Sequence, residues 1–423
     1  MLSFSVYTDG HPAEQVDLSG AYLIGTDDVP LRAELSFQNG TITCKKRAAG
    51  PAGLALLWEV PEVGRIMLET VRVPERDRPY ILQVELARAR LMRLLQKIEE
   101  WGQADVEIAP DVLEQVDQCR EQLIRALQAE TDADAAALGE RTLTLAVQIG
   151  ERLTAGRAEE EFRQRRDEGA FSRQVIGCRV PVNRPTDLIR KRISPAFDFV
   201  TVPIVWRDIE PAEQTFNWKP LDAWVEALNK QRIPIKGSAL LSFSEAHVPD
   251  WLYIWEHDFD TIRDLAFEHV RRVIHRYGQY IHAWDVISGI HADNCFTFNF
   301  EQLMELTRMA AALTKQIARR STTIIELVAP WGEYYARNQR TIPPLLYAEI
   351  ALQSGIPFDA LGVQFLFGVP ADGLYVRDML QISAQLDRFA ALGKTLHVSA
   401  TGVPSASHAD NSAAWPGNRC PAR

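Results

Sequence analysis

The sequence predicts an α/β protein whose larger part is a TIM-type (β/α) barrel, preceded by a small β-sandwich and a helical hairpin. Two observations predict the barrel. From about Phe171, short apolar runs alternate with amphipathic runs, which is the pattern of parallel strands joined by helices. The short runs are apolar almost throughout, as is typical of strands covered on both faces. A third observation, alternating runs separated by turn residues before about Val84, predicts the sandwich.

Seven strand candidates follow one another in the barrel region. They are QVIGCRV (174–180), FDFVTVPI (197–204), IPIKGSALL (233–241), YIHAWDVIS (280–288), TTIIELVAP (322–330), ALGVQFLF (360–367) and KTLHVSAT (394–401). The clearest helix between them covers 260–278, where Asp260 can cap the first turn, apolar residues recur at helical spacing and Gly278 ends the helix. This order of strands and helices predicts a (β/α) barrel.

A complete barrel needs an eighth strand and helix as well. The residues after Val403, PSASHADNSAAWPGNRCPAR, show neither strand nor helix periodicity. A barrel of seven strands would leave its first and last strands unpaired at their edges, which proteins normally avoid. We therefore expect a barrel that lacks its eighth unit, in a chain that is shortened or frame-shifted relative to its relatives, with an irregular tail at 406–423.

The predicted domains are a β-sandwich at 1–84, a helical hairpin at 85–168 and the barrel at 169–405. In the sandwich, Asn39-Gly40 between two alternating runs is the strongest hairpin signal. Leu, Ala, Glu and Arg at three-to-four spacing predict the two helices, over 81–101 and 112–166. The sandwich aromatics are either core residues or a surface that stacks on sugar rings; they are Trp58, Tyr22, Tyr7 and Phe37.

Composition excludes several classes of function. A net charge of -10 without a concentrated basic face argues against a nucleic-acid partner. The absence of an apolar run of about 18 residues argues against a membrane span, and the N-terminus lacks an export signal, so we expect a cytoplasmic protein. The five cysteines are widely spaced, and neither a cofactor motif nor a metal-ligand spacing is present. We expect no cofactor and no metal; the oligomeric state stays open.

Four stretches of the barrel region share motifs with one enzyme family. FDFVTVPIVWRDIEPAEQTFNW (197–218) is similar to a second strand followed by EPxxGxFNF, and IPIKGSALLSFSEAHVPDW (233–251) to a third strand with GHTLVWH and a later PxW. YIHAWDVISG (280–289) is similar to AWDVVNE, while FDALGVQFLF and LHVSATGVPS are similar to GIGLQSH and TELDV. In this order, the stretches resemble glycoside hydrolase family 10, the endo-1,4-β-xylanase family. The resemblance implies a TIM barrel that acts on xylan-type β-glycans.

The resemblance also locates two catalytic carboxyl groups. In the retaining mechanism of the family, an acid/base and a nucleophile lie about 5 Å apart across the glycosidic bond. These positions fall on Gly289 and Ala400, whose side chains cannot ionise. Of the family's sugar-site residues, Trp284, Asp285 and Gln364 match. Because general acid–base help alone contributes about 10²- to 10⁴-fold, we expect no ordinary xylanase activity.

Other acids near the ends of the barrel strands are alternative catalysts. The candidates are Glu333, Glu245 and Asp208, together with Asp293. Glu333 lies between Trp331 and Tyr334, whose rings could stack on a sugar, although a loop acid capping the next helix beside packed aromatics fits equally well. Glu245 shares a loop with His247, either as an acid/base pair or as two unrelated exposed residues.

The expected substrate-binding residues are Trp331, Tyr334, Gln364 and Trp284. Asp285 should point into the barrel below its mouth, where a hydrogen-bonded structural acid is more common than a catalyst. Three functions remain open: a carbohydrate-active barrel that binds a xylan-type polysaccharide or oligosaccharide without normal retaining hydrolysis, an active O-glycosyl hydrolase that uses relocated acids, and a non-catalytic interaction or scaffold protein.

Overall fold

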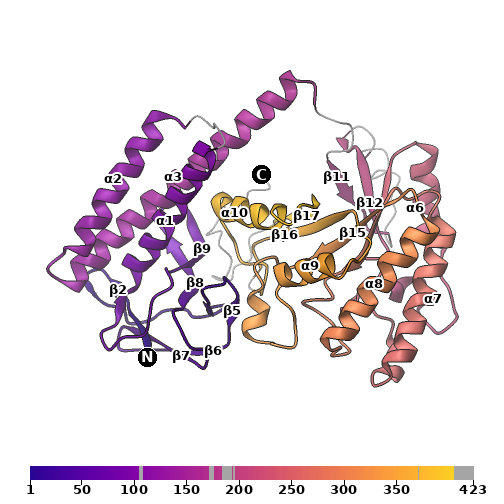
Figure 1. Ribbon diagram of the computed structural model, residues 1–423, viewed down its shortest axis with the longest axis horizontal. Helices are drawn as coiled ribbons and strands as arrows, with labels where there is room; N and C mark the ends of the chain where they lie inside the picture. The colour runs from indigo at the N-terminus through magenta and orange to yellow at the C-terminus, as the bar shows by residue number, and fades with distance from the viewer. Residues whose placement is uncertain (104–107, 171–175, 183–192, 194–195, 370, 404–423) are drawn as a thin grey trace.

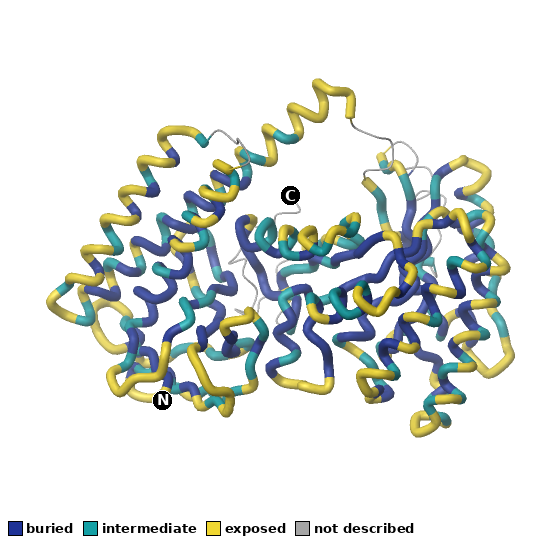
Figure 2. Tube along the Cα trace, viewed as in Figure 1, coloured by how far each residue is buried: buried dark blue, intermediate teal, exposed yellow. Residues whose placement is uncertain are grey.

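A computed structural model describes residues 1–103, 108–170, 176–182, 193, 196–369 and 371–403. The N-terminal strands and the helices α1 to α3 lie on one side of the molecule, and the barrel lies on the other (Figure 1). The barrel strands are mostly buried, whereas the outer surface of α2 and the far end of α3 are exposed (Figure 2). In this described part of the chain, no helix is both long and apolar enough to cross a lipid bilayer.

Two four-stranded sheets share one hydrophobic core at the N-terminus. The first has the order β10 (Tyr80–Ile81), β1 (Leu2–Ser5), β7 (Thr41–Lys46), β6 (Ala33–Gln38), and the second the order β5 (Pro30–Leu31), β4 (Tyr22–Ile24), β8 (Gly53–Val60), β9 (Gly64–Glu69). A small hairpin joins β2 (Tyr7–Thr8) to β3 (His11–Pro12). Phe4 and Ile42 of the first sheet pack with Leu56 of the second. This arrangement is the two-layer packing expected of a sandwich.

The predicted Asn39-Gly40 hairpin is confirmed. Strands β6 and β7 pair antiparallel, with Gln38 opposite Thr41. Both turn residues have positive φ, 49° for Asn39 and 73° for Gly40. A two-residue turn of this kind matches the twist of the flanking strands, and Asn and Gly tolerate its left-handed backbone best.

Three helices follow, where the sequence predicted a hairpin of two. They are α1 (Leu82–Gln103), α2 (Pro110–Leu127) and α3 (Asp132–Asp167). The expected helix at 112–166 is therefore wrong. It is divided because the Thr131 side chain accepts a hydrogen bond from the Asp134 backbone N–H and caps a new helix. The three helices pack together around a second small core that includes Leu94, Val116 and Ile149.

The seven predicted barrel strands form one parallel sheet in chain order. They are β11 (Gly177–Arg179), β12 (Phe199–Pro203), β13 (Ile235–Ser238), β14 (Ala283–Ser288), β15 (Thr322–Leu327), β16 (Ala360–Leu366) and β17 (Thr395–Gly402). The helices between them are α5 (Trp206–Ile209), α6 (Lys219–Lys230), α7 (Phe259–Tyr277), α8 (Phe300–Ile317), α9 (Pro344–Gln353) and α10 (Met379–Ala390), with 3-10 turns η1 (Asp250–Trp255) and η2 (Glu333–Ala336). The described residues thus supply seven units of a TIM barrel, as predicted; the expected tail at 406–423 lies outside them.

The sheet curls so that distant strands face each other. The ring of Phe199 on β12 lies 6.1 Å from the ring of His397 on β17. Strands β11 and β17 are the two edges of this sheet in the described chain. The interior is therefore narrow and is filled by side chains, as in other small barrels.

The predicted helix at 260–278 is confirmed, with a different cap. The helix α7 begins at Phe259, and the Asp258 carboxylate accepts the backbone N–H of Thr261, so Asp258 caps the helix instead of Asp260. The apolar stripe, which includes Val270 and Ile274, is buried in the barrel core.

The loop before α10 joins the barrel to the N-terminal sheets. Met67 of β9 donates its backbone N–H to the Val376 carbonyl at 2.9 Å, and the Gln381 side chain donates to the Met67 carbonyl at 2.9 Å. The turn η2 contacts β4 and β5. The loops that follow β15 and β16 are thereby held against the N-terminal region.

The close approach of β13 and β14 gives a test of the barrel core. A Cβ atom on Gly237 would lie 2.6 Å from the ring of fully buried Trp284, which pairs with Gly237 across the two strands. We expect Gly237→Ala to lower the free energy of unfolding by about 1–3 kcal/mol through overpacking, measured by urea denaturation. The matched control is Gly156→Ala on α3, where a Cβ meets nothing within 4 Å and the change should be neutral or stabilising. Equal effects of the two substitutions would contradict this account.

Candidate functional site at the barrel mouth

The two positions that the family resemblance assigns to catalysis lie on β17 and just after β14. Gly289 follows β14 and has a left-handed backbone with φ of +65°, and a Cβ there would lie 3.1 Å from a methyl group of Val328. Ala400 is half-buried on β17 and pairs with Gln364 on β16. Neither side chain offers a proton donor or a nucleophile.

Below the mouth, the inner face of the barrel carries buried charges. The Lys236 ammonium on β13 lies 2.9 Å from the Asp285 carboxylate on β14, and both side chains are almost completely buried. On the next strand, buried Glu326 accepts a hydrogen bond from the Ser288 hydroxyl at 2.5 Å. Asp285 points into the barrel, as predicted. The sequence reasoning did not single out Lys236 and Glu326, although each is the one charged residue in its strand.

Burial governs the protonation of this cluster. Burial, together with the negative charge of Glu326, raises the pKa of Asp285 to about 7, and Lys236 opposes this rise. Burial and the Lys236 ammonium lower the pKa of His397 to about 4, so this imidazole is neutral near pH 7. The protonation states of these buried groups therefore depend on one another, and the Asp285 carboxyl group titrates near neutral pH.

Glu333 lies away from open solvent. Its carboxylate accepts a hydrogen bond from the Arg377 guanidinium at 2.6 Å, and both side chains are almost fully buried. The same guanidinium donates to the Tyr22 hydroxyl at 3.3 Å. The catalytic role expected for Glu333 stays a prediction, and the structure gives this carboxylate a buried cation as its partner.

The neighbouring aromatic residues are also engaged within the fold. The Trp331 ring lies 5.7 Å from that of Phe365, and the Arg377 guanidinium lies 4.8 Å from its centre. The buried Tyr334 hydroxyl donates to the Ile342 carbonyl at 2.7 Å and contacts His291 Nδ1 at 2.7 Å. These contacts position the loop after β15.

The other two predicted binding residues differ in exposure. Trp284 is completely buried and packs on Gly237 in the barrel core, whereas Gln364 is half-buried on β16. Trp331 lines a cavity between the barrel and the N-terminal region, and Trp284, Gln364 and Tyr334 are not part of the wall of that cavity. Their roles in binding stay predictions.

Two predicted acids come together at the carboxyl ends of β13 and β14. Glu245 and Asp293 are both exposed. Partial desolvation and the nearby charge of Glu245 raise the pKa of Asp293. His247, in the same loop as Glu245, contacts the Ser244 hydroxyl through Nδ1 at 2.7 Å. Burial and the charge of Arg179 lower the pKa of His247, so its neutral form is favoured.

Asp208 lies in a separate cavity at the carboxyl ends of β11 and β12. The cavity has a volume of about 290 Å³. Its lining combines polar Arg179, Asp208 and Asn217 with the apolar surfaces of prolines and valines. A few polar groups on an apolar wall are typical of small-molecule sites. In the described part of the chain, no group of three or more His, Cys, Asp or Glu side chains is arranged to hold a metal ion.

The raised pKa of Asp285 predicts a pH dependence of stability. Between about pH 4 and 7 the folded protein binds a proton that the unfolded chain releases, so the free energy of unfolding falls as the pH rises through this window. Asp285→Asn cannot titrate, so we expect a weaker decline over the same window in urea denaturation series. The same slope in both proteins would contradict the assignment.

A double variant provides the control for this measurement. Asp285→Asn leaves the Lys236 ammonium buried without its carboxylate, which should cost about 3–5 kcal/mol near pH 8. Adding Lys236→Met removes that charge and should recover part of the loss.

Comparison with known proteins places this barrel in a family. The family model for glycosyl hydrolase family 10 matches residues 189–414, more than half of the chain. An endo-1,4-beta-xylanase/feruloyl esterase of Xylanibacter ruminicola is 21% identical over 237 residues, which are 51% of this chain and 31% of the relative. Endo-1,4-beta-xylanase C of Paenibacillus barcinonensis is 22% identical over 226 residues, which are 48% of this chain and 20% of the relative. The match thus spans less than a third of either relative's length.

Solved structures of xylanases are similar over a comparable share of the chain. Xylanase XynB from Paenibacillus barcinonensis, complexed with a conduramine derivative, is 16% identical, with a TM-score of 0.45 over 56% of this chain and 72% of that one. Xylanase B from Clostridium stercorarium F9 is 18% identical, with a TM-score of 0.44 over 56% and 73%. On the family match, and with the seven parallel strands in order, this chain is a divergent member of glycosyl hydrolase family 10.

Proposed function

We propose that this protein binds a xylan-type β-glycan at the mouth of its barrel and does not carry out the retaining hydrolysis typical of its family. The observation that carries this proposal is the pair of residues at the two catalytic positions, Gly289 and Ala400. Without an acid/base and a nucleophile, both steps of the retaining mechanism lose their proton transfer and their covalent intermediate.

The backbone at Gly289 supports the proposal. A φ of +65° is a conformation that L side chains rarely adopt, and the Val328 methyl groups occupy the space beside it. An acid at this position would be strained, so the local backbone is adapted to glycine. The backbone of the loop after β14 therefore disfavours an acid at position 289, in addition to the lack of a side chain there.

The cavity beside Asp208 is the proposed contact for the glycan. It opens at the carboxyl ends of the strands, where ligands of TIM barrels bind. At about 290 Å³ it is near the lower end of small-molecule pockets, so it suits one part of a longer chain. Arg179, Asp208 and Asn217 can bond sugar hydroxyls, while the proline and valine surfaces contact the ring faces.

A binding titration tests this proposal. We expect xylohexaose to give a saturable heat in isothermal titration calorimetry, with no reducing sugar released from xylan. Asn217→Ala should weaken binding about two- to tenfold, the loss of one or two hydrogen-bond contributions. Asn229→Ala, an exposed asparagine on α6 outside the cavity, is the matched control and should bind normally. No heat with xylo- or cello-oligosaccharides would refute the proposal.

A second candidate is hydrolysis by relocated acids. The observation that favours it is that burial and the nearby charge of Glu245 raise the pKa of Asp293. A carboxyl group with a raised pKa beside a second carboxyl group is a pairing used for acid–base catalysis. If it holds, the protein releases reducing sugar from xylan, and Glu245→Gln or Asp293→Asn lowers the rate about 10²- to 10⁴-fold. Glu256→Gln, also exposed but after η1, should leave the rate unchanged. An inactive unmodified protein would eliminate this candidate.

A further inference from the structure

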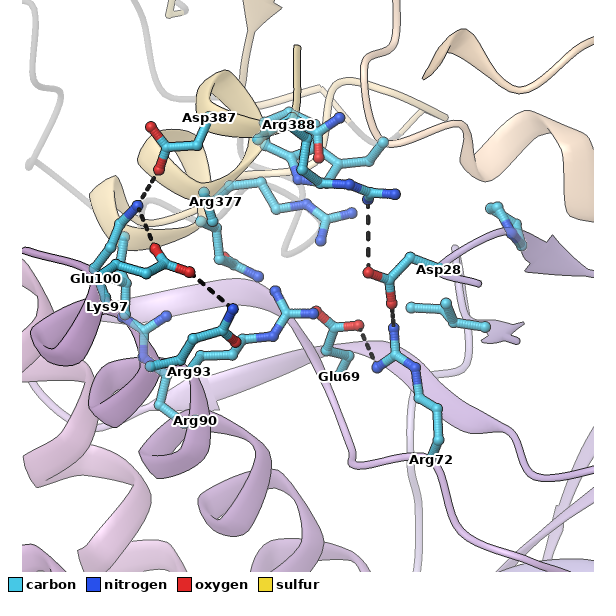
Figure 3. A pocket seen from close by; sticks show the side chains of 18 of the residues that line it. Asp28, Glu69, Arg72, Arg90, Arg93, Lys97, Glu100, Arg377, Asp387 and Arg388 are labelled. Carbon is cyan, nitrogen blue, oxygen red and sulfur yellow. Dashed lines mark hydrogen bonds and ion pairs between the residues drawn. The ribbon is translucent and has the colours of Figure 1, made fainter. Parts of the chain in front are cut away.

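A cavity between the N-terminal region and the barrel carries a concentration of cationic side chains. Its volume is about 440 Å³, within the range of small-molecule pockets of roughly 300–1,000 Å³. The wall is built from β4, β9, α1, α10 and the loops after β15 and β16 (Figure 3). Six lining residues are cationic: Arg72, Arg90, Arg93, Lys97, Arg377 and Arg388. Four are acidic: Asp28, Glu69, Glu100 and Asp387.

The acids are shared among the cations. Glu69 contacts both Arg72, at 2.8 Å, and Arg93. Asp28 contacts both Arg72 and Arg388, the latter at 3.8 Å. One carboxylate therefore serves two guanidinium groups, each of which has five N–H donors. Six cationic groups thus face four acidic groups in the cavity wall.

The pKa of Glu69 reflects the cationic groups that surround it in this cavity. Burial opposes ionisation of the Glu69 carboxyl group, yet the guanidinium groups of Arg93, Arg72 and Arg377 outweigh burial and lower its pKa below the ordinary value. An anionic group placed among the same cations would gain from the same field.

Two of the guanidinium groups are buried and incompletely bonded. The side chains of Arg90 and Arg377 are 3% and 2% exposed. Each has one strong acidic partner behind the cavity wall, Asp378 at 2.8 Å and Glu333 at 2.6 Å. Among the described residues, the Nε–H of each has no hydrogen-bond acceptor. A buried donor without a partner is costly, so these two guanidinium groups retain unused bonding capacity beside the cavity that they line.

We propose that this cavity binds a small molecule bearing a phosphate group. Guanidinium groups recognise phosphate oxygens through paired hydrogen bonds, and arginines from α1, from the segment after β9 and from the barrel would converge on one ligand. The volume leaves room for an organic part beside the phosphate, and Gln381 and Gln385 on α10 line the same wall. This proposal is independent of the proposed glycan site, since none of the residues is shared with the cavity beside Asp208.

Such a ligand would also strengthen the contact between the two halves of the molecule. Because it contacts side chains of both parts only when they are folded together, its binding raises the apparent stability of the folded protein. The thermal unfolding midpoint should therefore rise with ligand concentration.

The test uses the complete protein with two probes, inorganic phosphate and glucose 6-phosphate, at constant ionic strength. We expect saturable binding with one ligand per chain in isothermal titration calorimetry. Tighter binding of glucose 6-phosphate than of inorganic phosphate identifies a phosphate ester as the ligand class; equal or tighter binding of inorganic phosphate identifies the free ion. Both outcomes support a phosphate site.

Variants distinguish this site from general ion effects. The double variant Arg93→Gln, Arg388→Gln removes two half-buried cations while Arg72 still pairs with Glu69 and Asp28. It should bind about tenfold more weakly or worse, the loss expected for charged hydrogen bonds. The control is Arg120→Gln with Arg271→Gln. It removes two exposed cations, each of which pairs with an acid one turn earlier on its own helix, and this variant should bind normally. Circular dichroism checks that both variants fold.

Two results would overturn the proposal. One is the absence of saturable heat with either probe at millimolar concentration. The other is equal binding by the cavity variant and the surface control, which would mean that phosphate acts on the whole surface.

Discussion

Two buried ion pairs lie where the barrel meets the rest of the molecule. Arg377 pairs with Glu333 and Arg90 pairs with Asp378, at 2.6 and 2.8 Å, with all four side chains almost completely buried. Breaking such a pair would leave an uncompensated charge, at a cost of about 3–5 kcal/mol. The pair of Arg90 and Asp378 links α1 to the loop before α10. The pair of Arg377 and Glu333 joins the loops after β15 and β16 to each other, and the Arg377 guanidinium also donates to Tyr22 of β4. The same pairs place cationic groups around the cavity at this interface.

The barrel interior shows a related use of buried charge. Lys236 and Asp285 form an ion pair below the mouth, and Glu326 lies on the adjacent strand with a serine as its donor. These charged side chains thus lie below the two positions where the resemblance places family 10 catalysis. At the two positions that the family resemblance assigns to catalysis, the chain carries a left-handed glycine and an alanine. The proposal of glycan binding without retaining hydrolysis follows from this contrast.

The distribution of acids at the mouth follows from the loops that carry them. The loop after β15 packs against the N-terminal region, so Glu333 is buried there. The loops after β13 and β14 face solvent, which leaves Glu245 and Asp293 exposed and close enough to influence each other. Packing against a neighbouring unit, more than position along the strand, separates buried acids from accessible ones.

The sequence by itself determined the order of the seven strands, the Asn39-Gly40 turn and the family resemblance, because periodicity and turn chemistry are local properties. It also placed Asp285 on the inner face by strand parity. Periodicity alone did not divide the helix at 112–166, because α2 and α3 have the same helical spacing. The break is marked by Thr131, whose hydroxyl accepts from the Asp134 backbone N–H and donates to the Asp134 carboxylate. Only the tertiary structure decided that Glu333 meets Arg377 and that Lys236 meets Asp285. These partners are separated by tens of residues, and a charge's partner depends on distances that exist only in the folded chain.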